Sequence, residues 1–400
     1  MRILLHDFGG YAFIVPLSRG LAGMGHEVLH AYCGSVQTPQ GLLQRRDDDA
    51  PGLRFQALRL GEQIRKQALV KRWKQERQYA AMLSDLVRQT APDVVISADT
   101  PSQIQARLVK QCRRAGIAFV SWVQDLYGLA AYQILSRKLP FIGAALGRHY
   151  MRLDRRCLRD SDAVVLITEA FREMTTLWGI ADGLTTVIPN WAAIEELPPC
   201  PKDNDWARER GLDDKFCFVY SGTLAMKHNP ELLLKLGLRF RGRPYVRVVV
   251  VSEGPGADWL REAASRHGLE NVLVLPFEPF ERLPSVLGAA DVLVSILEPE
   301  AGGFSVPSKV LTYLCASRPL LLGVPPSNLA AQTVVAASAG LVAAPTDPGA
   351  FVSAAERLLA DPALRRQLGR NGRRYAEGNF QIGRITERFS TILGSVKKAA

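Results

Sequence analysis

Hydrophobic residues occur along the chain in short continuous runs that alternate with longer segments of helical periodicity. A short apolar run predicts a strand, and apolar residues spaced three and four apart predict a helix with one buried face. Several runs contain no polar residue, residues 248–251 above all, which is typical of strands covered on both faces. The alternation therefore predicts an α/β protein with parallel sheets flanked by helices.

The predicted elements are spread over the whole chain. In the first half the predicted strands are residues 3–6, 28–32, 94–97, 118–122 and 163–168, and the predicted helices are residues 13–24, 72–89, 102–115 and 171–178. In the second half the predicted strands are residues 216–221, 246–252, 272–275, 292–296, 320–323 and 340–343, each followed by a helical pattern.

A change of composition separates the two halves. The segment Ile188-Pro189-Asn190-Trp191 leads into a proline cluster at residues 197–201, which is typical of a linker between domains. We therefore expect two α/β units in tandem. Ligands of such sheets bind beyond the carboxyl ends of the strands, and a cleft between two sheets can hold both partners of a reaction.

The composition narrows the class of protein further. No apolar run reaches the roughly 18 residues that a membrane-spanning helix needs. His6 and Asp7 interrupt the first apolar run after three residues, so the N-terminus resembles a first strand more than a signal peptide. The six cysteines lie far apart, without the spacing of a metal site or of a disulfide framework, which favours a reduced, cytoplasmic environment.

The net charge of +11 is concentrated in the first half. Residues 1–190 have 25 Lys and Arg against 17 Asp and Glu, whereas the remainder has 25 against 22. In a helical segment at residues 137–159, one face carries four arginines at spacings of four, three and four: Arg148, Arg152, Arg155 and Arg159. Ile142, Leu146, Leu153 and Cys157 share another face of this segment.

A basic amphipathic helix of this kind can lie on an anionic membrane surface, where each Lys or Arg contributes roughly 1 kcal/mol. The alternative is the solvated face of an ordinary surface helix. We exclude nucleic acid as the partner because no zinc spacing, helix-turn-helix pattern or aromatic-rich strand motif accompanies the charge.

The candidate chemistry lies in the second half. The predicted strand at residues 292–296 leads through an acidic, glycine-rich loop to Pro307-Ser308-Lys309, where a helix is predicted to begin. The strand at residues 216–221 leads to Gly222 and then to Lys227. Two lysines and the N–H groups of a helix start could neutralise a diphosphate without a metal. Ordinary strand–loop–helix connections with surface lysines are the alternative interpretation.

Several motifs, taken in order, resemble the retaining GT-B glycosyltransferases of family 4 over nearly the whole chain. The matching segments are residues 8–10, the GHEV at 25–28, the VIPN at 187–190, 220–224 with Lys227, 283–292, the PSK at 307–309, 318–319, and 374–380. The resemblance implies two Rossmann-like parallel-sheet domains that face each other across a cleft. It further implies an acceptor-binding domain at residues 1–190, completed by about residues 376–400, and a nucleotide-sugar-binding domain at residues 191–375.

The resemblance also implies roles for individual residues. Gly9 and Gly10 correspond to a loop on the acceptor side. The residues implied at the donor are Gly222, Lys227, Pro276, Phe277, Glu278, Glu300, Gly302, Gly303, Phe304, Ser305, Ser308, Lys309 and Thr312. Among these, residues 276–278 are expected to hold the nucleobase through the backbone, and no metal is expected.

The chain departs from the family pattern at two positions. Family members usually carry a pair of glutamates here, and Phe304 and Thr312 occupy the two positions in this chain. Glu300 or the backbone of residues 303–304 could therefore make the contact with the donor sugar instead. The PSK motif, together with His228-Asn229 after Lys227, resembles a subgroup that builds bacterial surface polysaccharides, often from amino-sugar donors.

A glycosyl transfer needs positive charge at the departing diphosphate, for which Lys227, Lys309 and the N–H of Ser308 are the candidates. It also needs a group to assist the acceptor hydroxyl. Asp125 and Asp99 follow strands of the first half and are the main candidates for this group. His6 and Asp7 are the next candidates after them. Asp99 precedes Thr100-Pro101 and could instead cap a helix, so Asp125 is the preferred candidate.

We therefore expect a peripheral enzyme on the inner face of the cytoplasmic membrane. It is expected to move a sugar, from a UDP-linked donor in the first instance, onto a lipid-linked saccharide acceptor in polysaccharide, O-antigen or capsule synthesis. One alternative is a sugar-nucleotide epimerase of the same fold. Another is a non-catalytic partner of a true glycosyltransferase, which the missing glutamates would allow.

Overall fold

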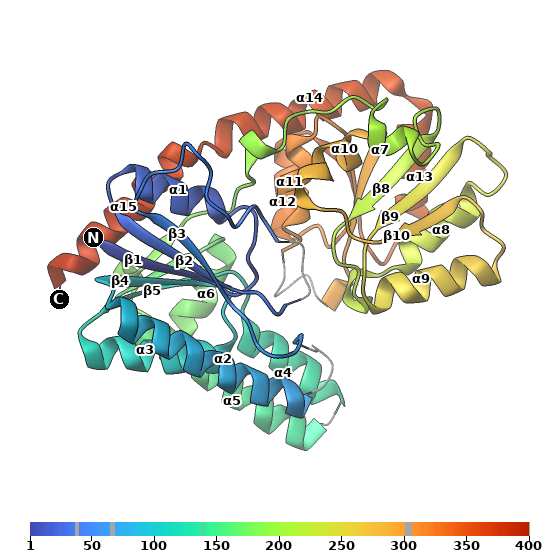
Figure 1. The fold of residues 1–400 in the computed structure, drawn as a ribbon. Helices are drawn as coiled ribbons and strands as arrows, with labels where there is room; N and C mark the ends of the chain where they lie inside the picture. The colour runs from blue at the N-terminus through green and yellow to red at the C-terminus, as the bar shows by residue number, and fades with distance from the viewer. Residues whose placement is uncertain (37–39, 65–68, 139, 301–305, 400) are drawn as a thin grey trace. The chain divides into compact units, whose positions relative to one another are not determined.

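The computed structural model describes residues 1–36, 40–64, 69–138, 140–300 and 306–399 (Figure 1). The chain forms two compact units. Unit 1 comprises residues 1–190 together with 381–400, and unit 2 comprises residues 191–380. The division falls directly after Asn190, within the segment that the change of composition marks as a linker.

Unit 1 contains a seven-stranded parallel sheet in the order β3-β2-β1-β4-β5-β6-β7. Its strands are β1 (Arg2–Asp7), β2 (Glu27–Cys33), β3 (Leu53–Leu58), β4 (Val94–Ala98), β5 (Ala118–Val123), β6 (Ala163–Leu166) and β7 (Thr185–Val187). The sequence pattern did not predict β3 and β7. Both lie at the edges of the sheet, and β3 alternates buried and exposed residues instead of forming a continuous apolar run.

Helices cover both faces of this sheet. They are α1 (Val15–Gly23), α2 (Leu69–Thr90), α3 (Ser102–Ala115), α4 (Tyr127–Lys138), α5 (Pro140–Arg159), α6 (Glu169–Leu177) and α15 (Ile382–Ala399). Figure 1 shows α1 and α15 on one face and α2, α3 and α5 on the other. Phe389 of α15 packs edge-on against Trp122 of β5, with ring centres 4.9 Å apart. The last helix thus completes unit 1, as the resemblance implies.

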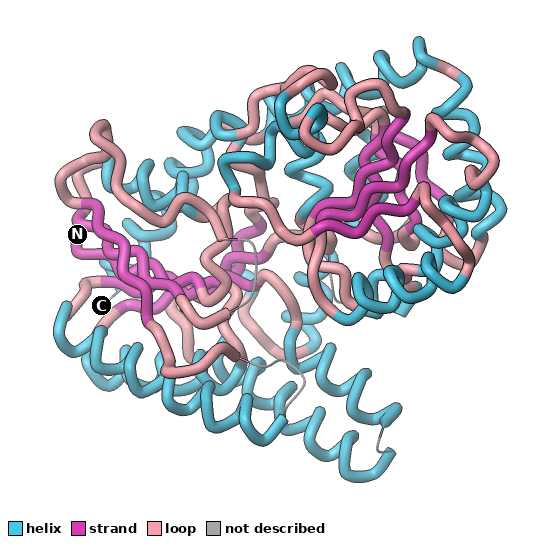
Figure 2. Tube along the Cα trace, turned by 45° about the vertical axis from the view of Figure 1, so that its right-hand side comes forward, coloured by secondary structure: helices cyan, strands magenta, loops and turns pink. Residues whose placement is uncertain are grey.

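Unit 2 contains a six-stranded parallel sheet in the order β10-β9-β8-β11-β12-β13. Its strands are β8 (Phe216–Ser221), β9 (Val246–Val251), β10 (Val272–Leu275), β11 (Val292–Ile296), β12 (Leu320–Gly323) and β13 (Gly340–Ala343). These bounds confirm the predicted strands to within one residue. Val248, Val249 and Val250 are all fully buried although they alternate between faces, because helices cover both sides (Figure 2).

The helices of unit 2 are α7 (Asp205–Arg208), α8 (Glu231–Arg239), α9 (Pro255–Arg266), α10 (Leu283–Gly288), α11 (Lys309–Cys315), α12 (Leu329–Ala336), α13 (Pro348–Ala360) and α14 (Pro362–Asn379). A short 3₁₀ turn, η3 (Met226–His228), lies between β8 and α8. Among the described residues, no helix combines the length and the apolar character needed to cross a bilayer.

Candidate functional site

Each sheet has one position at which the strand order reverses, which we call its switch point. In unit 1 the reversal lies between β1 and β4, and in unit 2 it lies between β8 and β11. Ligands of open parallel sheets bind beyond the carboxyl ends of the strands at this position. Predicted site residues follow all four strands, so the candidate sites are described at these two positions, one in each unit.

In unit 2, the loop after β8 begins at Gly222, whose φ of +121° is a conformation that side-chain-bearing residues rarely adopt. A Cβ atom at this position would lie 3.2 Å from Cε and 3.4 Å from Nζ of Lys309. Glycine therefore gives the loop its turn and leaves room for the lysine that crosses it.

Lys309 is the first residue of α11, and its side chain reaches the loop after β8. Its Nζ lies 3.6 Å from the centre of the Tyr220 ring and donates a hydrogen bond of 3.5 Å to the carbonyl of Thr223. Within the part of the chain that the structure describes, no carboxylate forms an ion pair with it. Burial, and then the charge of Lys227, lower the pKa of Lys309 well below the usual lysine range.

Lys227 lies on η3 with an exposed side chain. The backbone N–H of Glu298, just after β11, donates to the Lys227 carbonyl at 2.9 Å, which joins the two loops of the switch point. The imidazole Nδ1 of His228 accepts from the N–H of Ala225 at 2.9 Å and closes the same turn. The two lysines that the sequence singled out are therefore close enough to influence each other electrostatically.

The remaining predicted donor residues differ in their placement. Ser308 is exposed at the N-cap of α11, and its side chain makes no capping hydrogen bond. Because α11 has only seven residues, the lysine rather than a long helix dipole supplies the positive charge here. Thr312 is partly buried in the same helix, and Glu300 is exposed after β11. Gly302, Gly303, Phe304 and Ser305 lie outside the described residues.

Residues 276–278 follow β10. Pro276 is exposed and Phe277 is partly buried. The carboxylate of Glu278 accepts hydrogen bonds of 2.7 Å from Trp206 Nε1 and from Arg210, so this side chain holds the surrounding fold together. The backbone contact with a nucleobase that the resemblance implies for these residues stays a prediction.

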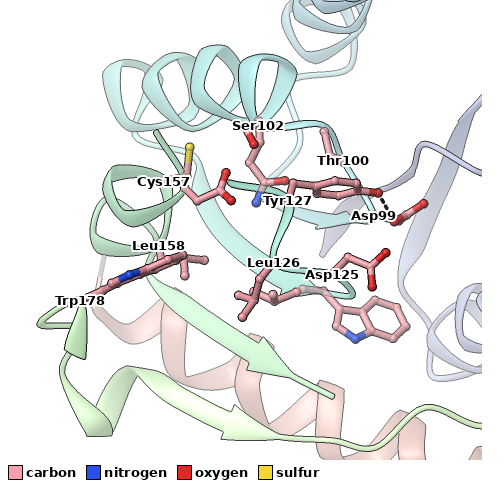
Figure 3. A pocket seen from close by; sticks show the side chains of 13 residues that line it. Asp99, Thr100, Ser102, Asp125, Leu126, Tyr127, Cys157, Leu158 and Trp178 are labelled. Atoms are coloured by element: carbon pink, nitrogen blue, oxygen red, sulfur yellow. Dashed lines mark hydrogen bonds between the residues drawn. The ribbon is translucent and has the colours of Figure 1, made fainter. Parts of the chain in front are cut away.

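In unit 1, a pocket lies at the carboxyl ends of β4 and β5 (Figure 3). Asp99, Asp125, Tyr127, Trp122 and Gln105 are among the residues that line it. Figure 3 shows the carboxylates of Asp99 and Asp125 at the same end of this pocket. The two predicted proton acceptors therefore belong to one site.

Asp99 directly follows β4 with a φ of +46°, which costs a non-glycine residue of the order of 1 kcal/mol. Its carboxylate accepts a short hydrogen bond from the Tyr127 hydroxyl (Figure 3). The N-cap of α3 is Pro101, so capping of that helix does not explain the position of Asp99. The strained backbone instead directs this carboxylate toward Tyr127 and the pocket.

The loop after β1 wraps around the buried carboxylate of Asp7. The N–H groups of Gly9 and Tyr11 donate to its two oxygens, and a Cβ on Gly9 would collide with the Tyr11 ring. Burial, and then the charge of Asp99, raise the pKa of Asp7. The charge of Asp99, together with burial, Asp7 and Asp125, raises the pKa of Tyr11. Three acidic side chains, Asp7, Asp99 and Asp125, are thus close enough at this end of the sheet to act on the same groups.

His6 lies behind the pocket rather than in it. Its two ring nitrogens are hydrogen-bonded at 3.0 Å to Thr100 Oγ1 and to the Tyr79 hydroxyl. Burial lowers the pKa of His6 to about 3, so the imidazole is neutral near pH 7. Its contacts are those of a structural residue.

Three tyrosines of these sites escaped the sequence analysis. Tyr220 and Tyr313 lie within apolar runs of unit 2 and read as core residues, and the sequence offers no signal of their polar contacts. Tyr127 follows Asp125 by two residues, a position from which it could have been suspected.

The arginine face of α5 lies on the surface. Arg148, Arg152, Arg155 and Arg159 are all exposed. On the apolar face of the same helix, Cys157 is buried and Leu153 partly buried. Near the start of the helix, Phe141 is 90% exposed, Ile142 73% and Leu146 42%.

Two models of known families match the chain in tandem. The Glycosyl transferase 4-like domain matches residues 9–191, and the Glycosyl transferases group 1 domain matches residues 202–375. Together they cover most of both units.

Two curated relatives match parts of the chain. A GDP-mannose-dependent alpha-(1-6)-phosphatidylinositol monomannoside mannosyltransferase of Mycolicibacterium smegmatis is 28% identical over 252 residues, 61% of this chain and 65% of that protein. An alpha-D-kanosaminyltransferase of Streptomyces kanamyceticus is 25% identical over 189 residues, 46% of this chain and 47% of that protein. These matches span less than two thirds of either relative.

Solved structures match over the full chain. Sucrose-phosphate synthase from Thermosynechococcus elongatus superimposes with a TM-score of 0.78 at 16% identity and covers 100% of both chains. Anabaena HepE in complex with UDP-glucose gives a TM-score of 0.71 at 16% identity, over 99% of this chain and 100% of that one. At 16% sequence identity, these comparisons show a shared fold only.

Proposed function

This chain is a family 4 glycosyltransferase of the GT-B fold, and on that premise we propose that it transfers a sugar from a nucleoside-diphosphate donor to a lipid-linked acceptor. One observation carries the proposal. Lys227 and Lys309 lie together at the switch point of the unit 2 sheet, beside a glycine that opens the loop. A diphosphate is the group that this combination of charge and exposed backbone would bind.

In the proposed reaction the two lysines act on the leaving group. As the glycosidic bond stretches, negative charge grows on the departing diphosphate, and fixed ammonium groups stabilise that charge. Each preorganised contact of this kind is worth a factor of about 10²–10³ in rate. The lysines would thus take the place of a metal ion.

Unit 1 is proposed to bind the acceptor and to assist its hydroxyl. Asp125 remains the first candidate for accepting the proton, and Asp99, held by Tyr127, is the second. Resemblance to the family favours retention of the anomeric configuration, so the acceptor would attack from the side of the leaving group. Gly9 and Gly10 would shape the acceptor side through the loop that encloses Asp7.

The donor is proposed to be a UDP-sugar in the first instance, and an amino sugar is supported by the PSK motif. The name of the kanosaminyltransferase agrees with the amino-sugar part of this proposal. The name of the mycobacterial relative specifies GDP-mannose instead. Both nucleotides therefore belong in the test of the donor.

The acceptor is proposed to be a lipid-linked saccharide of polysaccharide, O-antigen or capsule synthesis, on the inner face of the cytoplasmic membrane. Four exposed arginines and the exposed apolar side chains of Phe141 and Ile142 on α5 support contact with an anionic bilayer. The mycobacterial relative is named for a phosphatidylinositol mannoside, which is also a lipid acceptor.

The test is transfer by the purified full chain. UDP-glucose, UDP-N-acetylglucosamine and GDP-mannose are each incubated with a lipid diphosphate-linked sugar in vesicles, and the product is followed by mass spectrometry. We expect transfer from one donor, and a loss of about 10²-fold or more in Lys227→Ala and in Lys309→Ala. No transfer from any donor, together with no nucleotide binding, would contradict the proposal.

The same assay separates the two alternatives. Conversion of a nucleotide sugar without any acceptor would indicate an epimerase. A non-catalytic partner would show neither reaction, and the lysine variants would support surface polysaccharide synthesis in cells as well as the wild type does.

A further inference from the structure

Lys309 rests on an aromatic ring instead of facing a carboxylate. Its Nζ is 3.6 Å from the centre of the Tyr220 ring, and its only acceptor among the described residues is the Thr223 carbonyl at 3.5 Å. A ring face attracts an ammonium group, yet it offers far less than a carboxylate does. The side chain is thus held in place without being neutralised.

The ring itself is rigidly held. Tyr220 is fully buried at the end of β8, and its hydroxyl donates to the Thr223 carbonyl at 2.8 Å. The Tyr313 hydroxyl accepts from the N–H of Ser221 at 2.8 Å and donates to the Ser221 carbonyl at 2.9 Å. Two tyrosines therefore fix the loop across which Lys309 lies, and a Cβ at Gly222 would lie 3.4 Å from the Lys309 amine, so glycine leaves room for it.

We propose that Tyr220 is a positioning residue for Lys309, and that binding of the donor diphosphate loads a proton onto the Lys309 amine. The proposal rests on the proposed function, because the diphosphate is the ligand that would drive the proton uptake. The step is a simple protonation. The fraction of the amine that is unprotonated in the free protein takes one proton from the buffer and becomes the ammonium group that donates hydrogen bonds to the diphosphate oxygens.

The charges around Lys309 explain why the proton would arrive with the ligand. Tyr220 on β8 and Tyr313 on α11 are neutral, and Lys227 on η3 is positive. Glu298 and Glu300 follow β11, and neither forms an ion pair with Lys309 among the described residues. Burial and Lys227 together lower the pKa of the amine. A diphosphate between the two lysines supplies the missing negative charge and would raise that pKa again.

The test is calorimetric titration of the full chain with UDP-glucose and with GDP-mannose at constant pH, in buffers of different ionisation enthalpy. The diphosphate of these donors is a diester that does not titrate near neutral pH. The slope against buffer enthalpy therefore counts protons taken up by the protein. We expect the wild type to take up a measurable fraction of a proton for each donor bound.

Three variants identify the groups. Lys309→Arg keeps a permanent charge, so we expect the donor to bind with the proton uptake abolished. Lys235→Arg, on α8, is the matched control and should keep the wild-type uptake. Tyr220→Phe keeps the ring, so both the uptake and the affinity should stay within about threefold of the wild type. Tyr220→Leu removes the ring and should weaken donor binding about tenfold, whereas Tyr245→Leu at an exposed tyrosine should not.

The outcomes separate the two proposals. If neither donor binds to the wild type, the proposed function fails and this inference fails with it. If a donor binds without proton uptake, or if Lys309→Arg shows the same uptake as the wild type, the inference alone fails. A large loss of affinity in Tyr220→Phe would assign the role to the hydroxyl and overturn the role of the ring, even if Tyr220→Leu does not fold.

Discussion

Lys309, the proposed ligand of the diphosphate, is expected to lower the stability of the fold that carries it. Removing an ammonium group from water costs free energy that the Tyr220 ring and one carbonyl only partly offset. The cost is the physical reason for its lowered pKa. Natural proteins often accept such a loss of stability at a functional site.

We predict that Lys309→Met makes the protein more stable and unable to bind the donor. The pKa of Lys309 is lower in the folded than in the unfolded chain, so the penalty is absent above the unfolded pKa and grows as the pH falls below it. The melting temperature at pH 7 should rise by roughly 2–4 °C. This gain should shrink as the pH approaches 10.5, and thermal denaturation at both pH values would check it. A melting temperature lowered at pH 7 would contradict the assignment of a desolvated amine.

A second prediction concerns the carboxylates of the unit 1 pocket. If Asp125 or Asp99 assists the acceptor hydroxyl, its replacement by Asn should lower kcat about 10²–10⁴-fold and leave donor binding unchanged. The larger effect is expected at Asp125. Asp85→Asn, at an exposed residue of α2, is the control and should retain activity. If both pocket variants were as active as the wild type, neither carboxylate could be the group that assists the acceptor hydroxyl.

Individual residues also show how much of the candidate site can be predicted from the sequence. Gly222, Lys227 and Lys309 were predicted because they follow strands and carry charge or conformational freedom. Tyr220 could not be predicted as a site residue, because an aromatic residue in an apolar strand has the pattern of the core. Its contact with Lys309 depends on two segments about 90 residues apart, which only the sheet topology brings together.

At the scale of elements, the helical hairpin of α4 and α5 combines tight packing with an exposed start of α5. Three glycines allow the two helices to approach closely. A Cβ on Gly143 would lie 1.9 Å from the Leu135 carbonyl oxygen, and a Cβ on Gly147 would lie 2.4 Å from the Tyr132 Cα. At Gly128, a Cβ would lie 2.7 Å from the Met151 backbone nitrogen. The obstacle is backbone in each case, so it cannot move aside cheaply.

We predict that Gly147→Ala destabilises unit 1 by about 1–3 kcal/mol, because the added methyl group forces the helices apart. The matched control is Gly394→Ala in α15, where a Cβ meets no atom within 4 Å. There the better helix propensity of alanine should stabilise the protein by up to about 1 kcal/mol. Urea denaturation of both variants would test this, and equal effects would contradict the packing role of Gly147.

The same hairpin carries the prediction on membrane contact. The wild type should float with phosphatidylglycerol vesicles and not with phosphatidylcholine vesicles, and added salt should weaken the binding. Replacing both Phe141 and Ile142 by Glu should reduce the binding at least tenfold, because their exposed apolar surface could no longer enter the bilayer. Val335→Glu, on α12, is the control at another exposed apolar residue. Equal binding to both lipids, or an equal loss in the control, would contradict the prediction.

The helical wheel of α5 explains why the sequence described this element only in part. It placed the four arginines on one face correctly, since periodicity alone determines the face. It also placed Ile142, Leu146, Leu153 and Cys157 together on another face. On that face Cys157 is buried and Leu153 partly buried, whereas Ile142 and Leu146 are exposed. Periodicity determines which residues share a face, and not how much of that face a neighbouring element covers.

On the scale of the whole molecule, each unit forms its own doubly wound sheet, and each sheet reverses its strand order once. Continuous apolar strands made this architecture predictable in unit 2, where every strand was located to within one residue. In unit 1 the edge strands β3 and β7 were missed, since edge strands need less apolar sequence. The return of α15 to unit 1 came from family resemblance and not from any pattern in the helix itself.

The central claim is that Lys227 and Lys309 form one diphosphate site, and equilibrium binding of a nucleotide sugar tests it most directly. UDP-glucose and GDP-mannose are titrated into the full chain and into Lys227→Ala, Lys309→Ala and the surface control Lys235→Ala. We predict that at least one donor binds the wild type and the control equally, and binds each of the other two variants at least tenfold more weakly. If neither donor binds, or if both variants bind as the wild type does, the claim is contradicted.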